Sequence, residues 1–381
     1  MTEEIIYQNR KRPVGVAKPF AITNARIVLP DKIIPQGTIL VKGRKIAAIS
    51  RSRFAPAGVA KIDARTNYVA PGFIDLHIHG DVERVSRQQV KGGTTGFLAT
   101  LHPARPRALL EAISQVLAKK TRGWGAKVLG IRLEGPFLNR AFCGALPPEA
   151  LRRPDINEAR KIIRQAGGAL KMVVLAPELK EALKLIRLLR KHKIIASLGH
   201  TGATYEQAIK GVDAGIRHAT HTFNRMRQFH HCRPGALGAA LTDNRVVCEV
   251  IPEENHVHPA ALKLLLACKG LEKVALVTDS TAAQEYPPKK RRGDVFRLKD
   301  GTLYGTALTL NRALKNAIKF LELALPEAVR LVTLNPARVL QIERRKGSLA
   351  VGKDADIVIF DRNFNIKLAM VEGKVVYKCA A

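Results

Sequence analysis

The sequence predicts an α/β fold in which a (β/α)8 barrel is joined to a small β-sandwich domain built from both chain ends. From Val69 to about Leu340, short apolar runs alternate with longer helix-patterned stretches, as in repeated βα units. Both chain ends instead carry β-rich runs separated by turn signals. We therefore predict a barrel over residues 69–342 and a small domain formed by residues 1–68 and 343–381.

The small domain is predicted from two stretches of similar character. Near the start of the chain, Ile22 to Val28 and Thr38 to Val41 are rich in β-formers and are followed by turn signals. Near the end, Ala355 to Phe360 and Leu368 to Tyr377 are apolar and β-branched. Both ends are therefore β, while the 381 residues suffice for a large domain and a small companion.

The barrel is predicted from apolar runs that recur between helical stretches. They are Gly72 to Ile78, Thr95 to Thr100, Val128 to Leu133, Met172 to Ala176, Ile194 to Leu198, His218 to Thr222, Val246 to Ile251 and Val274 to Thr278. Eight parallel strands close a barrel, and its catalytic side chains lie at the carboxyl ends of the strands.

Rare polar residues fall at those ends. They are His77 and His79 in the first run, Glu134 after the third, His200 after the fifth, His221 in the sixth and Asp279 after the eighth. Strand residues two apart project to one face, so the histidine pair can share a metal ion. A carboxylate and two further imidazoles suit zinc or a similar divalent ion. Asp279 would then move the proton during hydrolysis.

Each of these residues also has an ordinary structural interpretation. Glu134 and Asp279 could cap the following helices, and His200 and His221 could be hydrogen-bonded core histidines. A His-x-His pair is common by chance. Six such residues in register with strand ends favour the metal site.

The charge balance is strongly basic. The chain has 64 Lys and Arg against 32 Asp and Glu, a formal net charge of +32. Such a field attracts anions, but the basic residues are spread through helix-like segments and aromatic residues are only 5%. We therefore expect a solvated surface that steers a small anion rather than a nucleic-acid site. The alternative is a catalytically silent barrel that binds polyanions.

Cysteine usage and hydropathy predict the compartment. The five cysteines are odd in number and form no C-x-x-C pair, which argues against a disulfide framework or structural zinc. Met1 to Arg10 lacks an apolar signal-peptide core, and no apolar run is long enough to span a membrane. We expect a cytoplasmic protein without a membrane partner.

Ordered motifs along the chain carry a resemblance to a known family. They include Pro71-Gly72-Phe73-Ile74-Asp75, Gly93-Thr94-Thr95-Gly96-Phe97, Leu133-Glu134-Gly135-Pro136-Phe137, Leu175-Ala176-Pro177-Glu178, His221-Thr222-Phe223-Asn224, Thr278-Asp279, Leu334-Asn335-Pro336-Ala337-Arg338 and Gly352-Lys353-Asp354-Ala355-Asp356. With these motifs the sequence resembles the metal-dependent amidohydrolase superfamily and, more closely, the N-acetylglucosamine-6-phosphate deacetylase family. The resemblance runs nearly end to end.

The resemblance implies a function and a role for each site residue. Glu134, His200 and His221 would hold the principal metal, Asp279 would be the catalytic acid and base, and His77 and His79 could hold a second ion. The cofactor would be one or two divalent ions per subunit, zinc first, with iron, manganese or cobalt as alternatives. The substrate would be an N-acetylated amino sugar carrying a phosphate, and the protein would be a homodimer.

The expected phosphate pocket departs from the family pattern. His256 and Asn224 match family positions around the sugar phosphate, but Arg225 replaces a usual Ala and Cys232 stands where an Arg is usual. We expect Arg225 or Arg233 to have taken over anion recognition, since Arg binds phosphate bidentately. The alternatives are that both arginines face solvent, or that the enzyme deacetylates a different N-acyl amino sugar. Leu146 stands where the family has a His, and this departure also bears on which N-acyl amino sugar is the substrate.

Overall fold

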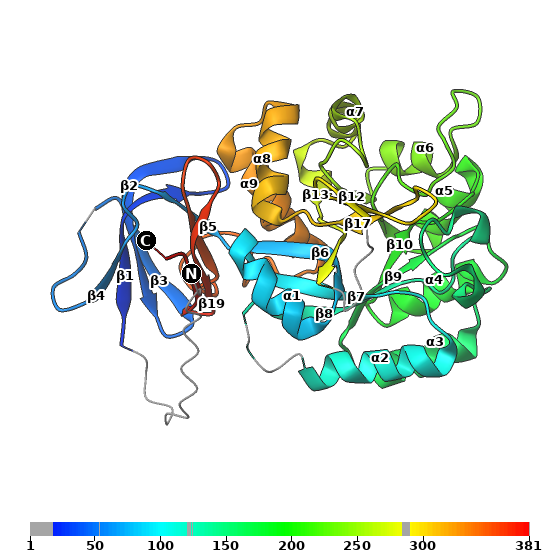
Figure 1. Cartoon of the computed structure of the whole chain (residues 1–381), viewed down its shortest axis with the longest axis horizontal. Helices are drawn as coiled ribbons and strands as arrows, with labels where there is room; N and C mark the ends of the chain where they lie inside the picture. Colours follow the sequence, from blue (N-terminus) through cyan, green and yellow to red (C-terminus); the bar gives the residue numbers. More distant parts are fainter. Residues whose placement is uncertain (1–17, 53, 120–122, 124, 284–289, 381) are drawn as a thin grey trace.

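The computed structural model describes residues 18–52, 54–119, 123, 125–283 and 290–380. The chain forms a small sheet domain beside a larger barrel, and Figure 1 shows the first and last described strands together in the small domain. The predicted fold class is therefore confirmed. The predicted boundaries stay a prediction, and residues 1–17 of the first segment, with the expectation about a signal peptide, lie outside the described residues.

The small domain is one sheet of eight strands in the order β20-β19-β18-β5-β1-β2-β3, with β4 paired to β1. Its strands are β1 (Phe20–Val28), β2 (Ile33–Lys42), β3 (Lys45–Ser50), β4 (Ala60–Asp63), β5 (Tyr68–Pro71), β18 (Ile357–Phe360), β19 (Ile366–Val371) and β20 (Lys374–Lys378). Antiparallel pairing of β18 with β5, such as Val358 with Ala70, joins the two chain ends. A separate apolar core that includes Ile22, Ile39 and Met370 lies inside this sheet.

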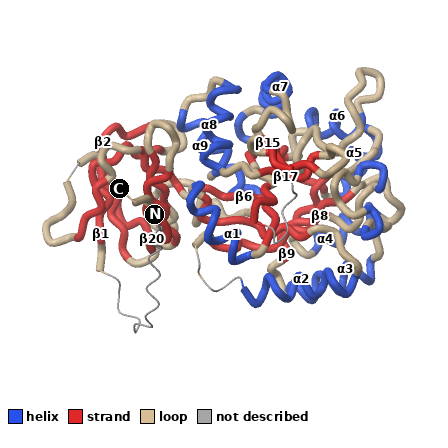
Figure 2. Tube along the Cα trace, in the orientation of Figure 1, coloured by secondary structure: helices blue, strands red, loops and turns tan. Residues whose placement is uncertain are grey.

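The barrel strands follow one another in sequence and in space. They are β6 (Phe73–Gly80), β7 (Thr94–Leu101), β8 (Lys127–Glu134), β9 (Leu170–Leu175), β10 (Ile195–Leu198), β11 (Ile216–Ala219), β12 (Val247–Val250) and β13 (Val274–Leu276). Each of these strands pairs in parallel with the next. Figure 2 shows the strands enclosed by helices. The eight apolar runs of the sequence thus correspond to these eight strands.

The ring closes through the segment after β13. After three intervening residues β14 (Ser280–Ala283) begins, and it pairs in parallel with β6. The backbone N–H of Asp279 also donates to the carbonyl of His77 over 2.9 Å. The eighth strand therefore has two segments, one against each neighbour, and Asp279 lies at the bend between them. An extension of β15 (Lys290–Arg292), β16 (Val295–Arg297) and β17 (Leu303–Thr306) continues from β14.

The helices cover the outside of the barrel. They are α1 (Val82–Gln89), α2 (Pro106–Lys119), α3 (Ile156–Ala166), α4 (Ala182–Lys191), α5 (Tyr205–Ala214), α6 (Gly235–Thr242), α7 (Pro259–Lys269), α8 (Leu310–Leu321), α9 (Leu325–Val332) and α10 (Leu334–Val339). α5 begins at a capping box in which Thr204 and Gln207 satisfy each other's backbone N–H groups. At the start of α3, Asp155 accepts two backbone N–H bonds, and after its last residue the helix is capped by Gly167, whose φ of 52° favours glycine. Within the described residues, no helix is long and apolar enough to cross a membrane.

Candidate active site

The six polar residues at the strand ends converge in space. His77 and His79 lie on β6, Glu134 is the last residue of β8, and His200 and His221 follow β10 and β11 by two residues. All of these side chains are nearly inaccessible to solvent, and only Asp279 keeps 14% of its side chain exposed. The carboxyl ends of parallel strands meet at one end of a barrel, which explains the convergence.

Glu134 lies at the centre of the group. Its Oε1 is 3.1 Å from Nε2 of both His200 and His221, and its Oε2 is 3.2 Å from Nε2 of His79. Asp279 lies on the other side, with Oδ1 3.3 Å from Nε2 of His77 and of His79. The side chains thus form two adjoining sets with metal-ligand chemistry, Glu134 with His200 and His221, and His77 and His79 with Asp279.

Hydrogen bonds behind two imidazoles turn their Nε2 atoms toward the group. Nδ1 of His200 is 2.9 Å from the carbonyl oxygen of Phe142, which can only accept, so Nδ1 carries the proton. Nδ1 of His77 is 2.9 Å from Oε1 of Glu249. Such outer bonds fix the orientation of imidazoles that bind metals. Both Nε2 atoms therefore face the position where an ion could bind, and the donor set fits a divalent cation.

Glu249 belongs to an ion pair inside the barrel. Arg132 on β8 donates to both carboxylate oxygens of Glu249 on β12, over 2.6 and 2.7 Å, and neither side chain is exposed. Glu249 also accepts the backbone N–H of His221 over 3.0 Å. Burial alone would raise the pKa of Glu249, but Arg132 and His77 hold that pKa well below its usual range. Glu249 thus supports two site histidines as an anion.

The acidic groups of the site are ionised. Burial would raise the pKa of Asp279, but the neighbouring His77 and His79 outweigh it and lower that pKa to about 2. Burial would also raise the pKa of Glu134, but His77, His200 and His221 outweigh it and hold that pKa well below its usual range. Both carboxylates are therefore available to bind a cation or accept a proton.

The backbone is strained at three site residues. His200, His221 and Asp279 have φ angles of 48°, 25° and 48°, in the left-handed region that non-glycine residues rarely adopt. Such a conformation costs about 1–3 kcal/mol per residue and persists where the surroundings enforce it. The chain thus accepts strain to aim these side chains into the barrel mouth.

A cavity of about 770 Å³ opens over the group. Its lining includes the predicted substrate residues Asn224, Arg225 and His256. The amide nitrogen of Asn224 is buried without a hydrogen-bond partner among the described residues, so it could donate to a ligand. Arg233 is exposed and lies outside this lining. The structure therefore separates it from Asn224, Arg225 and His256, the other predicted substrate residues.

Several cavity residues with functional side chains were not singled out in the sequence, among them His102, Arg227 and Tyr304. His102 follows β7, its ring stacks on His79 at 3.9 Å between centroids, and it forms a third potential ligand set with His79 and Glu134. Burial and the charge of His79 lower the pKa of His102 to about 3, so its imidazole is neutral. Arg227 and Tyr304 also line the cavity. His102 stands just past the second apolar run, where the rule that identified the others would have found it.

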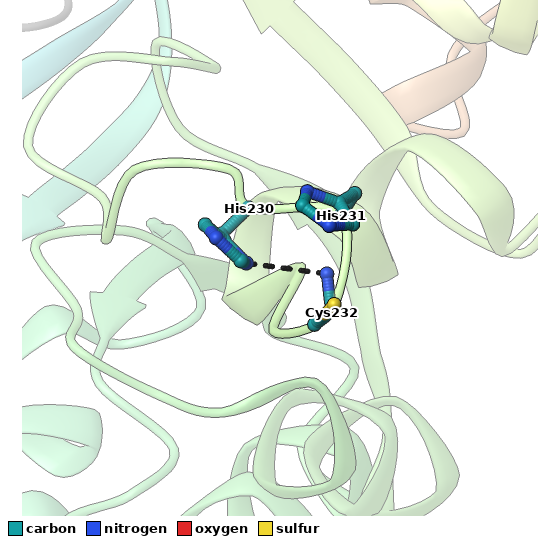
Figure 3. Close-up of side chains that lie close together, drawn as sticks. All are labelled: His230, His231 and Cys232. Carbon is teal, nitrogen blue, oxygen red and sulfur yellow. Dashed lines mark hydrogen bonds between the residues drawn. The ribbon is translucent and has the colours of Figure 1, made fainter.

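Another group with metal-ligand chemistry lies on the loop before α6. His230, His231 and Cys232 are adjacent and exposed, and Figure 3 shows the backbone N–H of Cys232 pointing at the His230 ring, 3.2 Å from Nδ1. Arg233 adds a cation beside them, which opposes a metal ion. The buried set is therefore the better candidate for a metal centre.

Comparison with known proteins identifies the family. The model of the amidohydrolase family matches residues 68–376. This chain belongs to the amidohydrolase family. The metal-dependent character of amidohydrolases agrees with the clusters of metal-ligating side chains described above.

Two curated relatives of this amidohydrolase match along most of their length. N-acetylglucosamine-6-phosphate deacetylase of Bacillus subtilis (strain 168) is 34% identical over 95% of this chain and 98% of the relative. N-acetylgalactosamine-6-phosphate deacetylase of Escherichia coli O157:H7 is 32% identical over 84% of this chain and 90% of the relative. The resemblance inferred from the sequence motifs is confirmed.

Solved structures agree with this amidohydrolase in fold. N-acetylglucosamine-6-phosphate deacetylase from Pasteurella multocida superposes with a TM-score of 0.86 at 27% identity, covering 94% of this chain and 99% of that one. A mutant deacetylase from Mycobacterium smegmatis in complex with N-acetyl-D-glucosamine-6-phosphate superposes with a TM-score of 0.85 at 29% identity, covering 95% and 100%. These relatives support the enzymatic interpretation over the polyanion-binding alternative.

Proposed function

We propose that this protein hydrolyses the acetamide of N-acetylglucosamine-6-phosphate and releases glucosamine-6-phosphate and acetate. The observation that carries this proposal is the convergence of Glu134, His200, His221 and Asp279 at the floor of one cavity. Relatives that match nearly the whole chain are named for this activity.

The donor set determines which residues would hold the cofactor. Glu134, His200 and His221 would hold the principal divalent ion, and His77 with His79 would hold a second beside Asp279. Imidazole nitrogens mixed with carboxylate oxygens suit zinc, with iron, manganese or cobalt as alternatives. When bound, such an ion polarises the acetyl carbonyl and lowers the pKa of water.

Asp279 is the residue that we assign to proton transfer. Its carboxylate is ionised, and its side chain is the most solvent-exposed of the six. It takes a proton from the attacking water and returns it to the sugar nitrogen as the carbon–nitrogen bond breaks. The sugar then leaves as an amine, and the acetyl group leaves as acetate.

Arg225 is the residue that we assign to recognition of the substrate phosphate. It lines the cavity together with Arg227, Asn224 and His256. Its guanidinium lies against Gly144, where any side chain would collide with it. Nδ1 of His256 bonds to Glu253, which leaves Nε2 of that imidazole for a ligand. These groups supply charge-assisted donors for a dianion.

The test is a deacetylation assay on matched substrates, with metal analysis of the purified protein. N-acetylglucosamine-6-phosphate should be preferred over N-acetylglucosamine. Arg225→Met should raise the Michaelis constant for the phosphorylated substrate about tenfold or more and leave the unphosphorylated one nearly unchanged. Arg233→Met is the matched control, since it removes the same charge outside the cavity. No preference for phosphate, or equal effects of the two variants, would contradict the assignment.

A different phosphorylated N-acyl sugar is the second candidate. Leu146 lines the cavity where the resembled family has a His, and one relative is named for N-acetylgalactosamine-6-phosphate. Comparing kcat/KM for the two epimers decides between them, because they differ only in the orientation of one hydroxyl.

The proposal also covers the cellular compartment and the oligomeric state of the enzyme. We place it in the cytoplasm, supported by five cysteines that are all free thiols. We also propose a homodimer, as the resemblance to the deacetylase family implies. Light scattering of the purified protein tests the dimer, and a monomer at micromolar concentration would contradict it.

A further inference from the structure

A second cavity, of about 690 Å³, lies where the barrel meets the small β domain. Cationic side chains from both domains line it, namely Arg44 and Lys374 from the small domain and Lys119, Lys127 and Lys171 from the barrel. Glu372 is the one carboxylate in the described lining. Lys119 is also paired with Asp81, which lies outside this lining, so five cations are offset by two carboxylates.

This interdomain cavity is far from the candidate active site. Lys127 is the first residue of β8 and Glu134 is the last. Seven steps along a strand span about 23 Å. A ligand in the interdomain cavity would therefore touch none of the groups assigned to catalysis.

The cations of the interdomain cavity are only partly neutralised within the protein. Arg44 and Lys127 both bond to Glu372, one to each carboxylate oxygen. In the described part of the chain, Lys171 and Lys374 form no ion pair. Like charges gathered at one interface repel each other, and an anion between them would relieve that repulsion.

The wall of this cavity is shaped around Lys171. Its side chain crosses Gly130 on β8, and any side chain at that position would collide with it. Glycines also line the rest of the barrel side, at Gly125, Gly167 and Gly168. The resulting space is nearly as large as the candidate active-site cavity, so it accommodates a molecule of sugar-phosphate size or larger.

We propose that the interdomain cavity binds a small molecule that carries two phosphate groups. Cations on the barrel wall would contact one phosphate and those on the small domain the other, so the ligand would link the two domains. The net charge of +32 raises the local concentration of such anions. This proposal does not depend on the substrate proposed above.

Calorimetric titration with fructose 1,6-bisphosphate tests the proposal on the full-length, metal-loaded protein. The double variant Lys171→Met and Lys374→Met should bind this probe at least about tenfold more weakly, because it removes one charge-assisted donor from each wall. The matched control is Lys161→Met and Lys210→Met, which removes equal charge from exposed positions on α3 and α5. The control should bind within about twofold of the unmodified protein.

Two further titrations complete the test. The first asks in which cavity the bisphosphate binds, and the second asks whether both of its phosphates are recognised. Arg225→Met should leave the affinity for the bisphosphate unchanged, whereas a loss there would place the probe in the active-site cavity. Inorganic phosphate should bind about tenfold more weakly than the bisphosphate, since it reaches one wall only. The proposal is overturned by absence of binding, by equal weakening in both double variants, or by equal affinity for the two probes.

Discussion

The barrel mouth and the small β domain both bury acidic side chains, but they surround them with different partners. In the barrel, Glu134 faces imidazoles, with His200 and His221 at 3.1 Å. In the small domain, Asp354 faces Lys45 at 2.7 Å and Lys346 at 3.1 Å. A neutral imidazole offers a lone pair that can bind a metal ion, whereas an ammonium group only donates hydrogen bonds. The partner, not the carboxylate, therefore distinguishes a chemical site from a structural ion pair.

The largest expected effect comes from removing an imidazole at the barrel mouth. His200→Ala should lose the principal metal and essentially all activity, because one of three proposed ligands is gone. Metal content by atomic spectroscopy and turnover measure both consequences. His230→Ala is the control, since it removes an exposed imidazole outside the cavity and should leave both unchanged. Full metal content with normal turnover in the His200 variant would refute the ligand assignment.

Asp279→Asn should lower turnover about 10²–10⁴-fold, because the amide keeps the size of the side chain but cannot accept the proton. The principal ion should be retained, since Glu134, His200 and His221 are intact. Turnover and metal content are measured on the same preparation. Near-native turnover with a full metal complement would require another base, and His102 would be the next candidate.

A third effect concerns the ion pair beneath the site. Glu249→Gln leaves the guanidinium of Arg132 buried without its anion, which should cost about 3–5 kcal/mol in the free energy of unfolding. The double variant Arg132→Met and Glu249→Met removes both charges and should recover much of that loss. Denaturant unfolding measures both. Additive losses in the double variant would show that the two charges do not depend on each other.

The sequence predicted the barrel and its six strand-end residues because each depends on a local signal, an apolar run followed by a polar residue. The partners of those residues were not predicted. Arg132 and Glu249 meet across the barrel from strands 117 positions apart, and the sequence does not state which strands face each other. Their charge within apolar runs was nevertheless a visible signal. Arg233 was proposed beside Arg225 because it adjoins Cys232, which stands where the family has an Arg, but Arg233 lies outside the cavity lining.

The smallest effect should come from the small domain, at Asp354. Burial would raise the pKa of this carboxyl, but Lys45 and Lys346 outweigh it and lower the pKa from 3.8 to about 2. A group whose pKa is depressed in the folded state stabilises the protein above its unfolded pKa and loses that contribution as pH falls through the folded value. Asp354→Asn should therefore lower the free energy of unfolding near pH 7, by about 1 kcal/mol after allowing for solvent around the Lys45 ammonium.

The difference between Asp354→Asn and the unmodified protein should shrink as the pH falls from about 4 toward 2, because the native carboxylate itself becomes protonated there. Urea unfolding at several pH values measures this. Asp31→Asn is the control, because its pair with Lys32 is solvent-exposed and should contribute within about 0.5 kcal/mol at any pH. Turnover should be unaffected in both variants, since neither carboxylate lines the active-site cavity. If Asp354→Asn lost turnover while its free energy of unfolding stayed unchanged, Asp354 would serve the chemistry rather than stability. The distinction between carboxylates that face imidazoles and carboxylates that face ammonium groups would then be wrong.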